Sequence, residues 1–236
     1  MHHILLDRWS QSDSPLHRIE ARAKILTLLV FLVVLATTPA NAALILITDA
    51  ALLLAAALLA RLPLLAILLR SLVVLPFSVT FALMSWLAGE PMRALGLLEK
   101  SYLAAFAALL VAATTPMSSL LGGLAKLGAP RLLVFVAQFL YRYLFVISEQ
   151  AQHMRLAAAC RQGNESARRT FGFRGATGAL AVLFARSYGR AEGIYRAMLA
   201  RGFSGRFSIL HHTRFGVRDA AFLTGVALFL ILARLG

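Results

Sequence analysis

The chain has 236 residues, of which 60% are hydrophobic and only 14% are charged, and its mean hydropathy is +0.77. Soluble domains are about 45–50% apolar and about 25% charged, so the composition excludes an ordinary soluble domain and favours an integral membrane protein. The formal net charge of +14 suits an anionic lipid surface or an acidic protein partner, and we expect no nucleic-acid partner.

Five apolar segments predict membrane-spanning helices after a polar lead-in at residues 1–22. Crossing the hydrocarbon of a bilayer takes roughly 20 residues, and all but one of the segments approach that length. The segments lie at residues 23–38, 42–60, 71–88, 102–113 and 220–235. The lead-in lacks the charged, apolar and small-residue order of a cleavable signal peptide, and we expect it to lie in the cytoplasm as an amphipathic helix.

The connections between the first four segments predict how they alternate across the membrane. Pro39 and Asn41 break the chain so briefly that the first two spans should form a helical hairpin. Residues 61–70 carry an arginine at each end, which predicts an interfacial turn on the cytoplasmic side. Residues 89–101 contain both acids and bases and are expected to form an outside loop.

Beyond Pro116 the pattern changes from membrane spans to long, more polar helices. A short amphipathic helix is expected at residues 117–129, followed by long helices at 131–163 and 178–201, with a basic loop between them. The first long helix is interrupted by Gln138, Arg142 and Glu149, which makes it too polar for a lipid-facing span. Arginines are dense from residue 155 to residue 218, and positive segments next to spans stay in the cytoplasm.

These patterns predict an all-α, polytopic integral membrane protein. It would have about five transmembrane helices, the N-terminus inside, and long cytoplasmic helices. Its parts would be residues 1–116, with the first spans, residues 117–215, with the long helices and their two arginine motifs, and residues 216–236, with the last span. If the helix after residue 131 also crosses the membrane, the number of spans is six.

Each long helix ends with an arginine that is followed by a glycine. Arg161 precedes Gly163, and Arg201 precedes Gly202, which suits the left-handed residue that ends many helices. A stripe of small residues, four apart and therefore on one helix face, leads to Arg201. Such a face lets two helix backbones approach closely, and we expect the two long helices to cross on it. Its members are Ala185, Gly189, Gly193 and Ala197.

Simpler interpretations of these arginines remain open. An arginine at a helix C-terminus is favoured by the helix dipole by about 0.3–1 kcal/mol. The arginine-rich segment can also act only as a topology signal that contacts lipid headgroups. Two arginines in matched settings, 40 residues apart, nevertheless suggest two equivalent receiving sites on a partner.

Three stretches of the chain resemble the energy-coupling transmembrane component, the T component, of ECF-type transporters. "SPLHRIEARAK" is similar to that family's opening Ser-x-Leu-His-x-Leu-Asp-Pro-Arg-x-Lys, with Glu20 for Asp and Ala21 for Pro. "TTPMSSLLGGLAKLGAP", followed by "FLYRYLFVISEQAQHMRLA", resembles its middle segment. "GRAEGIYRAMLARGF" resembles its most specific motif, which ends in Ala-Arg-Gly. Length and opening are most similar to the cobalt-transport members, CbiQ.

The resemblance implies a role in energy coupling for the two arginines. In that family, two Ala-Arg-Gly motifs insert their arginines into grooves on two ATPase subunits. Ala200, Arg201 and Gly202 match the second motif, whereas the first falls on Cys160, Arg161 and Gln162 and keeps only the arginine.

The implied partners are two CbiO-like ABC-type ATPase subunits, a CbiM-like substrate-binding membrane subunit, a small CbiN-like subunit and the lipid bilayer. Cobalt import for cobalamin biosynthesis is the expected process, with nickel or a vitamin as alternative substrates.

The sequence predicts a subunit that is not itself an enzyme. It lacks a phosphate-binding G-x-x-x-x-G-K-[ST] motif, so ATP and magnesium are expected in the partner subunits and no cofactor in this chain. The alternative is a membrane enzyme that acts on an anionic lipid at the arginine-rich face, although no catalytic motif or metal site is recognised there.

Three further features permit functional and incidental interpretations. Asp49, inside the second span, suits either a metal path or a buried polar pair. The pairs His2–His3 and His211–His212 are expected to be incidental, and Cys160, the one cysteine, excludes an intrachain disulfide.

Overall fold

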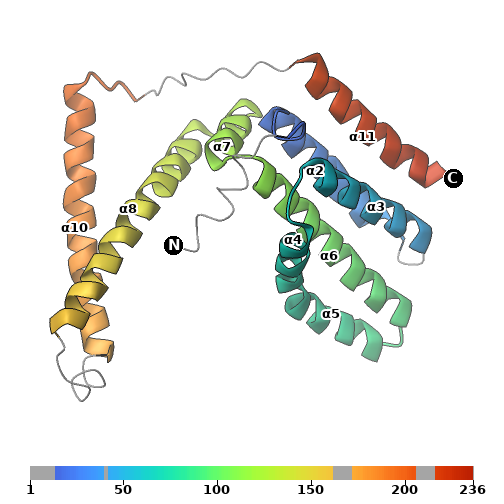
Figure 1. The fold of residues 1–236 in the computed structure, drawn as a ribbon, viewed down its shortest axis with the longest axis horizontal. Coiled ribbons are helices and arrows are strands. Elements are labelled where there is room, and N and C mark those ends of the chain that lie inside the picture. Colours follow the sequence, from blue (N-terminus) through green and yellow to red (C-terminus); the bar gives the residue numbers. More distant parts are fainter. Residues whose placement is uncertain (1–13, 40–41, 162–171, 206–215, 236) are drawn as a thin grey trace. The chain divides into compact units, whose positions relative to one another are not determined.

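The computed structural model describes residues 14–39, 42–161, 172–205 and 216–235 (Figure 1). All regular elements in these ranges are helices, which confirms the all-α prediction. The chain divides into two compact units. Unit 1 contains residues 1–134 and 213–236, and unit 2 contains residues 135–212.

Unit 1 is built around four helices that pack side by side. Helix α2 (Ala21–Thr37) contacts both α6 (Pro91–Thr114) and α11 (Val217–Leu235), and α3 (Ala43–Leu59) contacts the same two helices. Leu35 of α2, Leu53 of α3, Phe106 of α6 and Leu230 of α11 are buried in one apolar cluster between them. The first two predicted spans and the last one therefore share a core with the fourth.

The segment predicted as an interfacial turn is helical instead. Helix α4 (Leu64–Ser71) continues through the 3-10 turn η1 (Leu72–Val74) into α5 (Leu75–Leu87). Pro76 does not interrupt this run because it lies in the first turn of α5, where a backbone N–H is not required. Only residues 60–63 remain as a turn, so the turn is shorter than the one predicted at 61–70.

The predicted outside loop at residues 89–101 is also mostly helical. Gly89 adopts a positive φ of 86° and turns the chain after α5, and α6 begins with Pro91 at its first position. Most of the polar residues that suggested a loop lie on this helix, and Glu90, the residue just before it, forms an exposed ion pair with Arg93 in its first turn.

In the part of the chain that the structure describes, three helices are long and apolar enough to cross a membrane: Leu64–Leu87, Pro91–Thr114 and Arg131–Arg161. A shorter apolar helix covers Leu44–Leu59. Helices α2 and α11 occupy the positions predicted for the first and last spans, with 17 and 19 residues. By length and composition the helix at 131–161 is a candidate span as well, so the six-span alternative stays open.

Unit 2 contains two long helices, α8 (Arg131–Arg161), which begins in unit 1, and α10 (Gly172–Ala200). Both were predicted, but α10 begins six residues earlier than expected. Gly172 and Gly175, which suggested a loop, lie in its first turns. A short helix, α7 (Met117–Lys126), precedes α8 and packs against α2. The prediction of a short amphipathic helix after Pro116 is confirmed.

Gly123 of α7 lies close against α2, and this contact can be tested. A Cβ atom at Gly123 would lie 3.1 Å from the Cβ of Ala21 and 3.3 Å from the backbone nitrogen of Arg22. We expect Gly123→Ala to be less stable than Gly122→Ala by about 1–3 kcal/mol, the usual cost of overpacking. Thermal unfolding of both purified variants measures the difference.

Gly122→Ala is the matched control, since a Cβ there would meet no described atom within 4 Å. Both variants gain the same helix propensity of about 1 kcal/mol, so their difference isolates the contact with α2. Equal unfolding midpoints for the two variants would show that α7 does not pack against α2.

Candidate functional site

Helix α10 ends in a glycine turn that presents Arg201. The N–H of Gly202 donates to Leu199 O at 2.9 Å, and the N–H of Phe203 donates to Met198 O at 3.1 Å. These two bonds, with a positive φ of 76° at Gly202, form the Schellman motif. The prediction that Gly202 ends this helix in a left-handed conformation is confirmed, and Arg201 is left exposed at the tip.

The structure describes helix α8 as far as Arg161, the arginine of the first motif. Cys160 and Arg161 are both exposed in its last turn. Gln162 and Gly163 lie outside the described residues. Among the described residues, no acidic side chain forms an ion pair with either Arg161 or Arg201.

The two long helices of unit 2 run antiparallel. Arg190 of α10 donates to Gln150 of α8 at 3.4 Å. Further toward the start of α8, Val136 and Tyr143 line the same groove as Ile194 and Met198 of α10. Residue numbers rise along one helix as they fall along the other, so the C-terminal ends of the two helices point in opposite directions.

The two arginines have equivalent positions in this antiparallel pair. Arg161 lies 11 residues beyond Gln150, and Arg201 lies 11 residues beyond Arg190. At about 1.5 Å per residue, they are separated by roughly 33 Å along the pair. A local twofold axis through the Gln150–Arg190 contact would exchange them.

The stripe of small residues does not face α8. Gly189 and Gly193 are exposed, and a Cβ atom on either would meet no described atom within 4 Å. Ala185 and Ala197 are exposed as well. The two long helices therefore do not cross on this stripe, contrary to the prediction.

Helix α10 faces α8 with a different set of side chains. A groove of about 430 Å³ lies between the two helices. The α10 side contributes Ser187, Arg190, Ala191, Ile194 and Met198, and α8 contributes mainly apolar and aromatic residues. The sequence analysis missed this face because the smaller residues of the neighbouring stripe have a more regular spacing.

Other arginines of α10 form contacts within unit 2. Arg196 pairs with Glu192, one turn earlier on the same helix, at 2.5 Å. Arg190 reaches Gln150 across the groove. These contacts distinguish Arg190 and Arg196 from the two arginines at the helix ends.

Asp49 of α3 is buried inside unit 1, with 1% of its surface exposed. Neither carboxylate oxygen has a hydrogen-bond partner among the described residues. No group of three or more His, Cys, Asp or Glu in the described part of the chain could hold a metal ion. The pairs His2–His3 and His211–His212 lie outside that part, and a metal path at Asp49 stays a hypothesis.

The opening motif contains charged residues that the sequence analysis did not place in a site. Glu20 and Lys24 are 7% and 3% exposed, and both are tied to other helices of unit 1. Two charges next to an apolar segment were the available signal, because a charge that becomes buried there costs free energy unless it is paired or hydrogen-bonded.

Comparisons with known proteins agree with the fold and the motifs. The sequence profile of the CbiQ family, described as cobalt transport protein, matches residues 12–212. An uncharacterized protein of Methanocaldococcus jannaschii is 26% identical over 93% of this chain and 82% of its own length. The cobalt transport protein CbiQ of Rhodobacter capsulatus is 32% identical over 42% of this chain and 40% of that protein.

A second uncharacterized protein of M. jannaschii is 33% identical over 43% of this chain and 37% of its own length. These last two alignments therefore cover less than half of either partner. The family profile, by contrast, spans most of the 236 residues, from the opening motif through both long helices. This chain belongs to the CbiQ family of cobalt transport proteins.

Proposed function

We propose that this chain is the membrane subunit that couples ATP hydrolysis by two separate ATPase subunits to cobalt import. The family match and the apolar helices support a membrane transport component. Cobalt as the substrate follows from the family description and from the printed name of the Rhodobacter relative. The ATPases, a substrate-binding membrane subunit and the bacterial inner membrane belong to the same proposal.

The observation that carries the proposal is the equivalent placement of Arg161 and Arg201. A pair of identical ATPase subunits offers two equal grooves related by a twofold axis. Two exposed arginines, exchanged by a local twofold axis and roughly 33 Å apart, suit two such grooves. An arginine is suited to this contact because its planar guanidinium stays charged and can donate two bonds to one carboxylate.

The proposed mechanism is mechanical. ATP binding moves the two ATPase subunits together, and each carries with it the arginine that it holds. Since Arg161 and Arg201 end different helices, α8 and α10 are displaced relative to each other. The displacement passes to the membrane helices and reorients the substrate-binding subunit.

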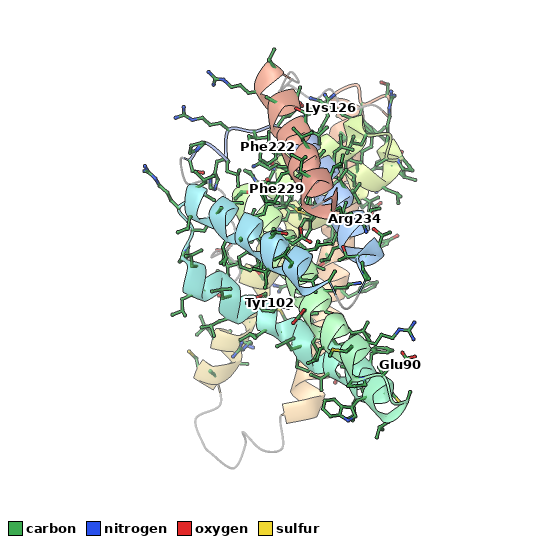
Figure 2. All side chains as sticks on the ribbon, turned by 90° about the vertical axis from the view of Figure 1, so that its right-hand side faces the viewer. Glu90, Tyr102, Lys126, Phe222, Phe229 and Arg234 are labelled. Carbon is green, nitrogen blue, oxygen red and sulfur yellow. The ribbon has the colours of Figure 1, made fainter. Side chains whose placement is uncertain are left out.

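The contacts of unit 1 support the proposed topology. The start of α2, the end of α6 and the start of α11 are joined by hydrogen bonds of Glu20 and Lys24. At the opposite end, Arg234 of α11 donates to Thr37 of α2 at 2.7 Å. Five spans with the N-terminus inside put the first three helix ends on the cytoplasmic side. Figure 2 shows Lys126 and Glu90 far apart at opposite ends of unit 1.

The arginine variants test the proposed coupling. Removing one member of a buried ion pair costs about 3–5 kcal/mol, because the other charge is left without a partner. We therefore expect Arg201→Ala and Arg161→Ala each to weaken ATPase binding, and the double variant to lose the ATPase. Co-purification of the ATPase and uptake of labelled cobalt measure both effects.

Two further variants serve as controls. Arg201→Lys keeps the charge but loses the planar fork, so partial rescue is expected. Arg186→Ala removes an exposed arginine from the middle of α10 and should leave binding unchanged. If the double variant still binds the ATPase and transports normally, the coupling role is wrong. The two arginines would then only stabilise the helix dipoles and set the topology.

Accessibility of introduced cysteines tests the topology. In a Cys160→Ser background, Met92→Cys should react with an impermeant reagent from outside, and Ser204→Cys only from inside. Both positions are exposed, whereas nearby Ala94 is buried and unsuitable. Reaction of both cysteines from one side of intact cells would contradict the five-span arrangement.

A further inference from the structure

Glu20 contacts both segments through which the chain leaves unit 1 for unit 2 and returns from it. The chain leaves through α7, which ends at Lys126, and enters α8 at Arg131. It returns into α11, which begins at Val217. Lys126 and Asp219, one at each passage, both bond to Glu20.

The carboxylate of Glu20 holds the outgoing segment. Its Oε1 lies 3.4 Å from Nζ of Lys126 and 3.2 Å from Nε of Arg22, and the Glu20 side chain is 4% exposed. The two cations are 21% and 28% exposed, so the pairs lie at the edge of the buried region. Close packing at Gly123 holds the same end of α7 against α2.

The backbone of Glu20 holds the returning segment. Its N–H donates to Oδ1 of Asp219 at 2.8 Å, while Oδ2 of Asp219 accepts from the N–H of Gly216, also at 2.8 Å. An acid at the third helical position that reaches back to the N-cap N–H is half of a capping box. Asp219 therefore fixes the start of α11 and joins it to the start of α2.

Lys24, one turn further along α2, attaches the end of α6 to the same place. Its ammonium group donates to the carbonyl of Thr114 at 2.8 Å and to the hydroxyl of Thr115 at 3.0 Å. Cations favour helix C-termini, where carbonyl groups lack partners within the helix. The starts of α2 and α11, the end of α6 and the end of α7 thus meet in one polar cluster.

We propose that Glu20 is a positioning residue for energy coupling, the joint through which both ends of unit 2 act on the membrane helices. Because one residue holds the outgoing and the returning segment, a displacement of α8 and α10 reaches α2, α6 and α11 together. This inference rests on the proposed function, since it assumes that displacement of unit 2 drives transport.

Charge and burial favour this role over simple stabilisation of the fold. Buried ion pairs add little net stability compared with apolar packing of the same volume, and their best-attested role is to fix registry. Unit 1 already has an apolar core that includes Phe31, Leu35 and Phe106. The Glu20 cluster lies outside that core, at the two passages to unit 2.

The experiment uses the whole complex, purified with its ATPase and reconstituted in vesicles. Glu20→Gln keeps the size of the side chain and removes its charge. We expect the cobalt taken up per ATP hydrolysed to fall about tenfold, the effect of losing one strong charged hydrogen bond. ATPase binding and the hydrolysis rate should persist, because Arg161 and Arg201 are unchanged.

Three variants control for a general loss of structure. Glu20→Asp keeps the charge and should restore most of the coupling. Glu90→Gln removes an ion pair with Arg93 at the other end of α6 and should change coupling by less than about twofold. Lys126→Gln, at a partly exposed position, should uncouple in the same direction even if Glu20→Gln fails to assemble.

Two results would contradict the proposed role of Glu20 in coupling. One is normal cobalt uptake per ATP in both Glu20→Gln and Lys126→Gln. The other is a loss of uptake that only follows the amount of folded complex, without uncoupling. If the double variant Arg161→Ala and Arg201→Ala releases the ATPase while Glu20→Gln couples normally, the role of Glu20 is wrong and the proposed function stands. If no ATPase binds the wild-type chain, the proposed function fails as well.

Discussion

The hydrocarbon of the membrane contains no water to satisfy backbone N–H and C=O groups, and this constraint explains most of the structure. A chain with the apolar segments of this one must form helices, which satisfy these groups internally. Only the helix ends leave unpaired groups, so charged and polar side chains are found there. Lys24 meets the end of α6, and Asp219 meets the start of α11.

Unit 2 contains two kinds of arginine. Arg190 and Arg196, along α10, find partners within the unit in Gln150 and Glu192. Arg161 and Arg201 lie at helix ends, exposed and equally far from the contact between the two helices. A partner that binds both arginines could therefore displace the two helices from two points. In our proposal, the Glu20 cluster transmits both displacements to the helices of unit 1.

Much of the fold could be predicted from the sequence, because apolar segments and helix-ending glycines act locally. The positions of α2, α3 and α11, and the glycine turn after Arg201, follow from residues within a few positions of each other. Polar character was a poorer guide. Arg93 and Glu99 suggested a loop but lie on α6, and Glu90 directly precedes that helix.

Contacts between distant segments could not be predicted in this way. Nothing near Glu20 in the sequence indicates Lys126 or Asp219, which are more than a hundred residues away. The spacing of small residues on α10 likewise identified a real face but not its partner, since four-residue spacing defines a face and says nothing about what covers it. The match between the two arginines became visible only when the Gln150–Arg190 contact fixed the antiparallel register.

The central claim is that one chain engages two ATPase subunits, one through each arginine. Photo-crosslinking residues placed at 161 and 201 of the same chain test it most directly, with the products resolved by mass after illumination of the purified complex. The account predicts a product that contains one membrane chain and two ATPase subunits, and single-site versions that each capture one. Capture of a single ATPase subunit by the doubly substituted chain, or of none, would contradict it.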